Sequence, residues 1–457
     1  MRKVFVLITC GFLFFVMAGS VSGAEKIRLT LDEAIALGLQ NSISLRVKML
    51  AIQSAKTDVQ SARASYYPGI NGSLTWIHIF DRDKTPSTTI DISGTPITIP
   101  GSYMIASDPV TISAELTQSF YTFGRIKNAL KMAQEGVRVA EIDFEEEKRS
   151  LTVKIKRAFY GYILAREVMK VQEDNLARKK DALNIARKRY AAGLIPDFEV
   201  LSAEVDVESF KPTVITARNE VRYAMLAVMD LLGIEKEGEY ELELIGSLEP
   251  EYHIFDREKL IQYAFMNNYE LRQYQTAISL SGYQRAVASG EKKPLIAGFA
   301  NYSLQSGFDP ETGKNLYWGK DSWNGDFSVG VRAQMQFSSL FPFSRENAQV
   351  VKTELGIESQ KERLRSAQSR IKMGLESILL KLEEEKAKIA SSLKGVELAT
   401  KLYNSAKERY LHGLIPRSEL EDSQTTLNSA QVGYLTAVYG YQSSLFDLAD
   451  MVGVDHF

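Results

Sequence analysis

The chain contains a long internal repeat, which constrains its fold more than any other feature. Residues 186–196 read ARKRYAAGLIP, and residues 406–416, 220 positions later, read AKERYLHGLIP. Upstream, Pro68 and Pro294 follow similar segments at a spacing of 226. A period this long indicates a duplicated half-domain rather than a solenoid of short repeats. We therefore predict a first structural repeat at 25–240 and a second at 241–457, related by pseudo-twofold symmetry.

The first residues have the order of a secretory signal peptide, which we place at 1–24. Arg2 and Lys3 precede an apolar run over 4–17, and small residues follow at 22–24. We expect cleavage near Ala24 and export of the mature chain. The single cysteine, Cys10, lies inside the apolar run, so the mature chain has neither disulfides nor thiol chemistry.

Composition excludes several classes of function. Arg2 and Lys3 belong to the 55 basic residues, so 53 remain in the mature chain against 57 acidic ones. A near-neutral balance without a basic block argues against a nucleic-acid partner. After residue 24 the sequence contains no run of about 18 apolar residues, so we predict no transmembrane helix in the mature chain. The four histidines are scattered and no H-E-x-x-H, G-x-S-x-G or P-loop motif occurs, so we predict no enzyme activity, no cofactor and no metal site.

Two long windows read as single helices. Residues 125–192 and 345–412 contain no proline and are rich in Ala, Leu, Glu, Lys and Arg, which favour helices. Their apolar residues recur at steps of three and four, as in coiled coils. At 1.5 Å per residue each window makes a helix of roughly 100 Å. Shorter helices are predicted at 30–66, 197–231, 256–292 and 417–451.

Glycine and proline mark two tight turns between these helices. Gly193 and Gly413 end the long helices and suit the left-handed C-cap conformation. Pro196 and Pro416 follow three residues later and suit the start of a returning helix. Pro212 predicts a kink in the first returning helix alone.

Four segments alternate between apolar and polar residues with a period of two, namely 70–80, 110–120, 296–304 and 327–337. Each is about as long as a tilted strand that crosses a bilayer, which takes about 9–11 residues. Apolar-out and polar-in alternation is typical of a barrel with a wet lumen. The same alternation also fits a soluble antiparallel sheet covered by helices on one face, and this alternative stays open.

The strand patterns assign individual side chains. Glu115 and Arg332 are expected to face the lumen, and Trp76, Tyr302 and Phe337 to face lipid or its interface. Four strands cannot close a membrane barrel, because the smallest have about eight. Since an open sheet edge in lipid leaves backbone groups unpaired, several copies must share one barrel. Three copies would supply twelve strands and a lumen.

The order helix, strand, strand, long helix, Tyr-x-x-Gly tip and returning helix, duplicated after a signal peptide, resembles the TolC family of outer-membrane efflux proteins. The segments LTQSFYTFGRIKNAL (116–130) and AQMQFSSLFPFSRENAQ (333–349) are also similar to the family. The likeness covers essentially the whole mature chain. The tip residues that carry it are Tyr190, Gly193, Leu194, Tyr410, Gly413 and Leu414.

The resemblance implies an α+β membrane protein of the cell outer membrane that extends into the periplasm. A long α-helical coiled-coil barrel and a transmembrane β-barrel would be shared by a homotrimer, with four strands per chain. Segment 233–255 would form part of a belt around the helical barrel. This chain departs from the family in two respects. It lacks the lipidated N-terminal cysteine that members of the metal and drug branches often carry, and the double glycine common after the second strand is reduced to Gly124 in the first half and missing in the second.

The implied function is a passive outer-membrane exit duct of a tripartite efflux or type I secretion system. It would conduct small molecules or proteins from an inner-membrane pump, with a periplasmic adaptor (membrane fusion) protein between the two. The cargo is left open. The alternative is a periplasmic coiled-coil spacer with a soluble β cap.

The resemblance also implies where functional residues lie. The two tips would contact the adaptor, although a plain helix cap explains Gly193 and Gly413 equally well. Glu419 and Asp422, three apart on one helix face, would form a periplasmic gate, and Arg417 would neutralise part of it or latch it closed. The alternative is that acidic residues simply favour a helix N-terminus.

Overall fold

The computed structural model describes residues 25–78, 80, 87–92, 95–99, 107–234, 240–308 and 323–454. The predicted signal peptide lies outside these ranges. They divide into two compact units. The hairpin unit comprises the described residues up to Ser42, Leu151–Glu251 and Glu384–Ser443. The sheet unit comprises Ile43–Ser150, Tyr252–Glu383 and the described residues from Ser444.

The long helices are confirmed. Helix α3 (Arg125–Ala191) and helix α7 (Arg345–Leu411) each have 67 residues. The returning helices α4 (Asp197–Leu232) and α8 (Arg417–Val452) each have 36 residues, and α4 continues through Pro212. Within the described ranges, none of these or the shorter helices combines the length and the apolar character that crossing a bilayer would require.

Two of the predicted shorter helices are each broken once. The first is α1 (Leu31–Asn41) followed by α2 (Ile43–Ala64), and the second is α5 (Arg257–Asn267) followed by α6 (Tyr269–Glu291). The side chain of Asn268 accepts a hydrogen bond from the backbone N–H of Leu271 and so caps α6. Short polar side chains of this kind compete for backbone groups and favour caps over helix interiors. The prediction of uninterrupted helices was therefore wrong at Ser42 and Asn268.

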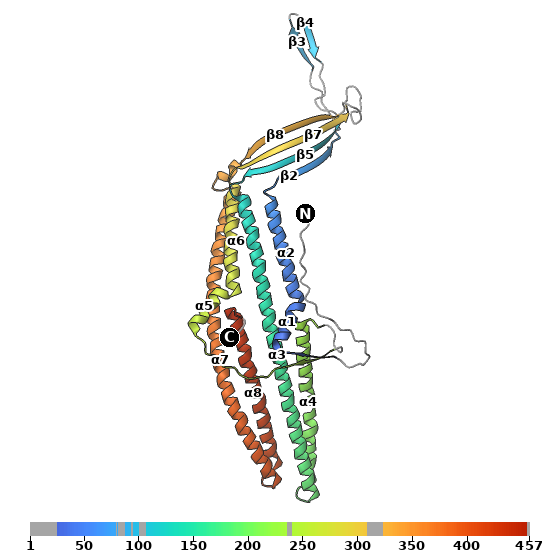
Figure 1. The fold of residues 1–457 in the computed structure, drawn as a ribbon, viewed down its shortest axis with the longest axis vertical. Helices are drawn as coiled ribbons and strands as arrows, with labels where there is room; N and C mark the ends of the chain where they lie inside the picture. Colours follow the sequence, from blue (N-terminus) through green and yellow to red (C-terminus); the bar gives the residue numbers. More distant parts are fainter. Residues whose placement is uncertain are drawn as a thin grey trace, which may run out of the picture. The chain divides into compact units, whose positions relative to one another are not determined.

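The four predicted strands form one antiparallel sheet in the order β2 (Gly69–Trp76), β5 (Ser107–Tyr121), β7 (Leu295–Phe308) and β8 (Asn324–Gln334). Figure 1 shows them as one layer that continues into α3 and α7. Strand β8 ends before Phe337, which opens a short 3₁₀ helix, η1 (Phe337–Leu340). The predicted strand at 327–337 thus has the observed length but lies three residues too far along the chain, and Phe337 is not a strand residue.

Four further short strands were not predicted. Strands β3 (Thr88–Ile92) and β4 (Thr95–Ile99) pair as an antiparallel hairpin between β2 and β5 in the sequence. Strand β1 (Glu25–Leu29) pairs in parallel with β6 (Tyr240–Leu244) in the hairpin unit. The guanidinium of Arg166 in α3 donates hydrogen bonds to the carbonyl oxygens of Leu244 and Gly246, 3.1 Å each, and so ties the chain after β6 to this helix. The predicted belt segment 233–255 contains β6, and its residues 235–239 lie outside the described ranges. The boundary at 240/241 between the two repeats, at the start of β6, remains a proposal.

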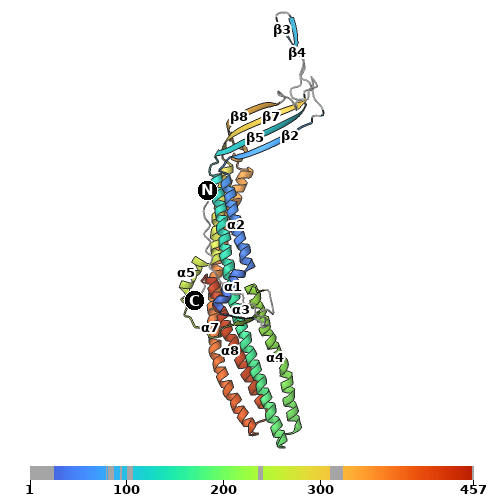
Figure 2. The same ribbon diagram turned by 45° about the vertical axis from the view of Figure 1, so that its right-hand side comes forward.

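The core of the hairpin unit lies between antiparallel helices. Near the second tip α7 and α8 bury one apolar cluster, formed by Ala399, Tyr403, Ala406, Tyr410, Ile415, Leu420 and Leu427. Near the first tip α3 and α4 bury a smaller one, formed by Leu183, Ala186, Ala203 and Val207. Figures 1 and 2 show both tips at the same end of this unit.

Candidate gate and docking site at the helical tips

The two tips have the same backbone conformation. Gly193 and Gly413 are left-handed, with φ of 71° and 72°. In each tip the glycine N–H donates a hydrogen bond to the carbonyl oxygen of the tyrosine three residues before it. The N–H of the following leucine donates to the carbonyl oxygen of the arginine that precedes this tyrosine, and all four distances are 2.8–3.0 Å. This is the Schellman arrangement, which satisfies the last carbonyl groups of a helix. The glycine spacing therefore predicted the shape of both turns.

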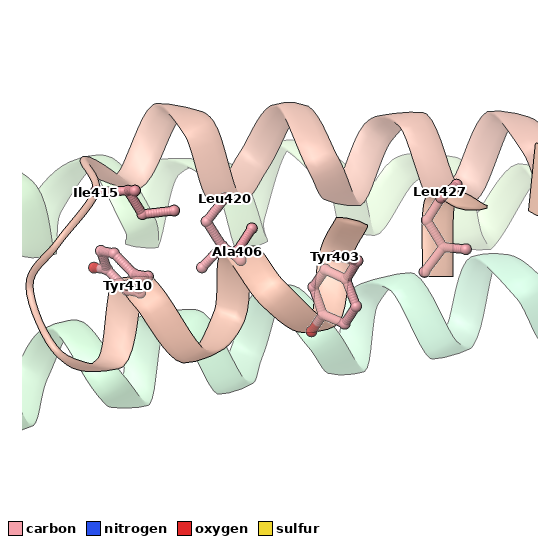
Figure 3. Packing of buried hydrophobic residues seen from close by; sticks show 7 residues of the cluster. Tyr403, Ala406, Tyr410, Ile415, Leu420 and Leu427 are labelled. Carbon is pink, nitrogen blue, oxygen red and sulfur yellow. The ribbon is translucent and has the colours of Figure 1, made fainter. Parts of the chain in front are cut away.

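The side chains of the two tips differ. Tyr190 is 47% exposed, whereas Tyr410 is fully buried in the cluster shown in Figure 3. Burial raises the pKa of the Tyr410 hydroxyl above its ordinary value, Arg189 opposes this and Glu199 adds to it. Leu194 and Leu414 are both strongly exposed, at 69% and 68%. The tips are thus symmetric in backbone and in their leucines but not in their tyrosines.

Arg189 of the first hairpin reaches the second tip. Its Nη1 donates a hydrogen bond to the carbonyl oxygen of Tyr410 over 3.1 Å, and its guanidinium lies 5.0 Å from the centre of the Tyr410 ring. A Cβ atom on Gly413 would lie 3.1 Å from Nη2 of Arg189. The absence of a side chain at Gly413 therefore gives Arg189 room, in addition to allowing the positive φ.

Arg417, predicted as part of the gate, sits in a charged cluster between α3, α4 and α8. Its guanidinium donates to the carboxylate of Asp206 and to the hydroxyl oxygen of Ser202, both on α4. Glu421, one turn further along α8, lies 3.7 Å from Arg417. Because Arg417 and Asp206 are only 17% and 22% exposed, water screens this ion pair less than it screens a surface pair.

Lys179 of α3 completes this cluster, with its Nζ 3.9 Å from the Glu421 carboxylate. Burial lowers the pKa of Lys179, the carboxylate of Glu421 opposes that shift, and the positive charge of Arg417 reinforces it. Two cations and two carboxylates from three helices thus meet near the tips. Such a cluster can join the two hairpins as long as each charge keeps its partner.

Glu419 and Asp422 lie on the exposed side of α8, one turn apart. The structure brings Arg417 to Asp206 and Glu421, so the carboxylates that Arg417 contacts are not the two predicted with it. Leu420 and Ser423, next to them in sequence, are buried and face the helix pair. The carboxylates of Glu419 and Asp422 are therefore exposed to solvent and can contact ions or another molecule.

The sheet separates polar from apolar side chains across all four strands. In an antiparallel sheet, residues paired across strands share a face. One row of pairs places Glu115 beside Asn71 and Asn301, and Ser328 follows on β8. The adjacent row, on the other face, consists of Ile70, Leu116, Ala300 and Val329.

Neighbouring rows repeat this separation, so the alternation in the four strands is in phase. Arg332 is on the face of Glu115, with its guanidinium 5.0 Å from the centre of the Phe299 ring. Tyr302 and Trp76 are on the apolar face, where Tyr302 pairs with Ala114 and Phe327, and Trp76 with Val110.

Comparison with known proteins agrees with this architecture. Residues 34–234 match the family model described as outer membrane efflux protein. The structure of CusC, described in connection with transmembrane channel formation, superposes with a TM-score of 0.73 at 16% identity over 93% of this chain and 92% of that one. The Campylobacter jejuni CmeC outer membrane channel gives 0.73 at 15% identity, over 93% and 85%. The Neisseria gonorrhoeae MtrE outer membrane channel gives 0.68 at 16%, over 95% and 94%. No curated protein matches the sequence.

The predicted resemblance and fold class are confirmed, with long paired helices joined to a strand domain. The match over residues 34–234 indicates an efflux protein of the outer membrane. The structural relatives named above are channels rather than enzymes.

The sequence did not reveal the partners of Arg417. Asp206 and Ser202 are four residues apart and so share a face of α4, as Arg417 and Glu421 share a face of α8. That spacing was visible in the sequence, but nothing indicated that the two faces meet. The missed strands β1 and β6 did carry a signal, because Tyr240, Leu242 and Leu244 alternate with acidic residues.

Proposed function

We propose that three copies of this chain form an outer-membrane exit duct of a tripartite efflux or type I secretion system. The duct conducts small molecules or proteins passively from an inner-membrane pump, to which a periplasmic adaptor connects it. The strands of the three copies form one transmembrane barrel, and the helices form a hollow periplasmic cylinder. The family match over residues 34–234 supports the outer-membrane efflux channel, and the two-faced sheet supports the shared barrel.

The observation that carries the proposal is the in-phase separation of the two faces together with the open edges of the sheet. Among the residues that the structure describes, strands β2 and β8 each have a neighbour on one side only. An unpaired edge in hydrocarbon costs several kcal/mol for each backbone group left without a hydrogen bond. Sharing the edges among three copies pairs them and puts Glu115 and Arg332 into a wet lumen, with the apolar face toward lipid.

The gate of the duct lies at the second tip. In a trimer the exposed carboxylates of Glu419 and Asp422 converge on the axis and form a ring that attracts cations. The contact of Arg417 with Asp206 holds α8 against α4 within each chain. Breaking this contact frees the second hairpin and widens the ring.

The adaptor docks on the exposed leucines of the tips. Leu194 and Leu414 occupy equivalent positions after Gly193 and Gly413, and exposed apolar side chains paired in this way mark an interaction surface. Tyr190 adds to the surface at the first tip, whereas buried Tyr410 supports the second tip from inside. Replacing Leu194 and Leu414 by asparagine is expected to abolish transport in cells without changing conductance in a bilayer.

Single-channel conductance in a planar bilayer tests the proposal. The wild-type protein is expected to give small, cation-selective channels, and Glu419→Ala/Asp422→Ala is expected to give larger and less selective ones. An unchanged conductance in the variant would place the constriction elsewhere while keeping the duct. Well-folded oligomer that gives no channels, and that carbonate washes from membranes, would overturn the proposal in favour of a periplasmic spacer.

A further inference from the structure

The connection between β8 and α7 is longer than its counterpart in the first half. Gly69 and Leu295 are equivalent at the spacing of 226, and they pair with Thr117 and Gln334 respectively. Thr117 precedes the first residue of α3 by eight positions, whereas Gln334 precedes the first residue of α7 by eleven. The second half therefore has three additional residues here, within the segment that contains η1. We name residues 337–343 the phenylalanine turn.

The phenylalanine turn presents large apolar side chains to the outside. Their exposed fractions are 73% for Phe337, 58% for Leu340, 53% for Phe341 and 86% for Phe343. The rings of Phe341 and Phe343 stack, with centroids 5.4 Å apart and planes within 6°. Several exposed apolar side chains in one short segment indicate a surface that another apolar phase covers.

A polar network beneath the turn fixes its shape. Ser339 is fully buried, and its carbonyl oxygen accepts a hydrogen bond from the hydroxyl of Ser344 over 3.3 Å. The side-chain amide of Asn347 donates to the carbonyl oxygen of Phe341, and its oxygen accepts from the ammonium of Lys292. These hydrogen bonds therefore fix the backbone of the turn, and the fixed backbone keeps the apolar side chains directed outward.

The turn lies where the strands meet the long helices (Figure 1). The junctions touch one another there, since a Cβ atom on Gly290 would contact the side chain of Arg125, and Lys293 lies 5.8 Å from the centre of the Phe123 ring. Basic residues outnumber acidic ones in these junctions. They are Arg125, Lys127, Lys292, Lys293 and Arg345, against Glu291 and Glu346.

The turn also continues an apolar surface. Phe327, Val329 and Val331 on the apolar face of β8 are 66%, 74% and 69% exposed, and the turn follows shortly after them along the chain. An apolar surface bordered by lysine and arginine complements a phospholipid leaflet, because acyl chains accept the apolar groups and phosphates attract the cations. We propose that the phenylalanine turn is a lipid anchor, which inserts its four apolar side chains into the leaflet of the outer membrane next to the strand–helix junction. The inference rests on the proposal that the sheet spans this membrane.

Fluorescence quenching tests the anchor. Phe343→Cys carries an environment-sensitive fluorophore, and it is the single cysteine of the mature chain because Cys10 lies in the predicted signal peptide. Val331→Cys and Leu194→Cys are matched controls, since both residues are exposed and apolar but lie on β8 and at the first tip. The assembled protein is reconstituted in vesicles of phosphatidylcholine and phosphatidylglycerol. Lipids brominated along the acyl chain serve as the membrane quencher, and iodide serves as the aqueous quencher.

The label at 343 is expected to lose most of its fluorescence with lipid brominated near the headgroup end and little with iodide. The label at 194 is expected to behave in the opposite way. Quenching of the 343 label by iodide, or shielding from both quenchers by a neighbouring subunit, would overturn the anchor. If the 331 label is quenched by lipid and the 343 label is not, the anchor fails while the membrane position of the sheet stands. If neither label is quenched by lipid, the spanning sheet itself fails.

Discussion

The guanidinium of Arg189, in the last turn of α3, donates a hydrogen bond to the carbonyl oxygen of Tyr410, in the last turn of α7, over 3.1 Å. One hairpin thereby holds the end of the other. The contact depends on Gly413, because a side chain there would press on Arg189. At the equivalent Gly193, a side chain would meet no heavy atom of the described residues within 4 Å, apart from those of its chain neighbours.

Alanine at the two glycines is therefore expected to have unequal effects. Gly193→Ala costs about 1–2 kcal/mol, the usual penalty for a left-handed residue with a Cβ atom. Gly413→Ala costs more, because Arg189 must also move. Hydrogen exchange of the tip amides measures both. In an Arg189→Ala background the cost of Gly413→Ala should fall to that of Gly193→Ala, and equal costs in the wild-type background would contradict the tie.

The two tip tyrosines also predict a difference in stability. Tyr410→Ala removes a fully buried ring and is expected to cost about 3–5 kcal/mol, as for other large aromatic residues in cores. Tyr190→Ala removes a half-exposed ring and is expected to change stability by about 0.5 kcal/mol or less. Thermal unfolding followed by circular dichroism compares them. Similar losses in the two variants would show that Tyr410 is not buried in the assembled protein.

The ion pair of Arg417 and Asp206 predicts a latch on the gate. Asp206→Ala is expected to destabilise the second hairpin by about 1.5–3 kcal/mol, because a partly buried guanidinium loses its charged acceptor. Single-channel conductance is expected to rise. Glu204→Ala is the control, since its pair with Arg187 is about half-exposed on both sides and should contribute less than about 1 kcal/mol. A conductance that rises equally in both variants would count against the latch.

Glu146 of α3 predicts a pH dependence in the sheet unit. Partial burial, followed by the negative charge of Asp143, raises the pKa of Glu146. The hydrogen bond from Gln273 and the positive charge of Lys48 lower this pKa by less, and the negative charge of Asp450 raises it slightly. A raised pKa means that the folded state binds the proton more tightly than the unfolded state, whose pKa is near 4.5. This contribution is fully present below pH 4.5 and is lost as pH rises through the folded pKa.

Glu146→Gln is therefore expected to stabilise the protein at neutral pH, by less than about 1 kcal/mol because the carboxylate is partly solvated. The variant should also unfold with a flatter pH dependence above pH 4.5. Glutamine keeps an oxygen for the hydrogen bond that Gln273 donates over 2.6 Å. Thermal unfolding at several pH values measures the effect. A wild type and variant with parallel pH profiles would assign the dependence to other groups.

The ends of the long and returning helices were predictable because glycine and proline residues mark them. Gly193, Gly413, Pro196 and Pro416 fix where α3, α7, α4 and α8 end or begin, and the predicted bounds agree with the structure within one residue. The breaks at Ser42 and Asn268 were missed, because a single polar residue in a helical pattern is usually tolerated on the exposed face. The alternation of apolar and polar residues located the four strands of the sheet. After β8 the same alternation continues as far as Phe337, so the prediction extended the strand into η1.

The candidate site was less predictable, because it depends on which helix faces meet. Tyr190 and Tyr410 share one motif, yet only the structure shows that one is exposed and the other buried. Arg417 was singled out from its place after the second tip, but its partner Asp206 lies on the other hairpin. A repeat in the sequence reports equivalent positions, and it does not report contacts between the two copies.

The outer sides of β2 and β8, which pair with no other strand in the described part of the chain, have a genetic consequence. If each chain pairs its outer strands with those of its neighbours, one subunit with a poorly pairing strand prevents closure of every barrel that contains it. A cell that makes both normal and variant chains would then lose more transport activity than the proportion of variant chains suggests. Substitutions that disrupt backbone pairing along β2 or β8 would behave as dominant alleles, whereas substitutions at the tips, which leave ring closure intact, would be diluted by the normal subunits.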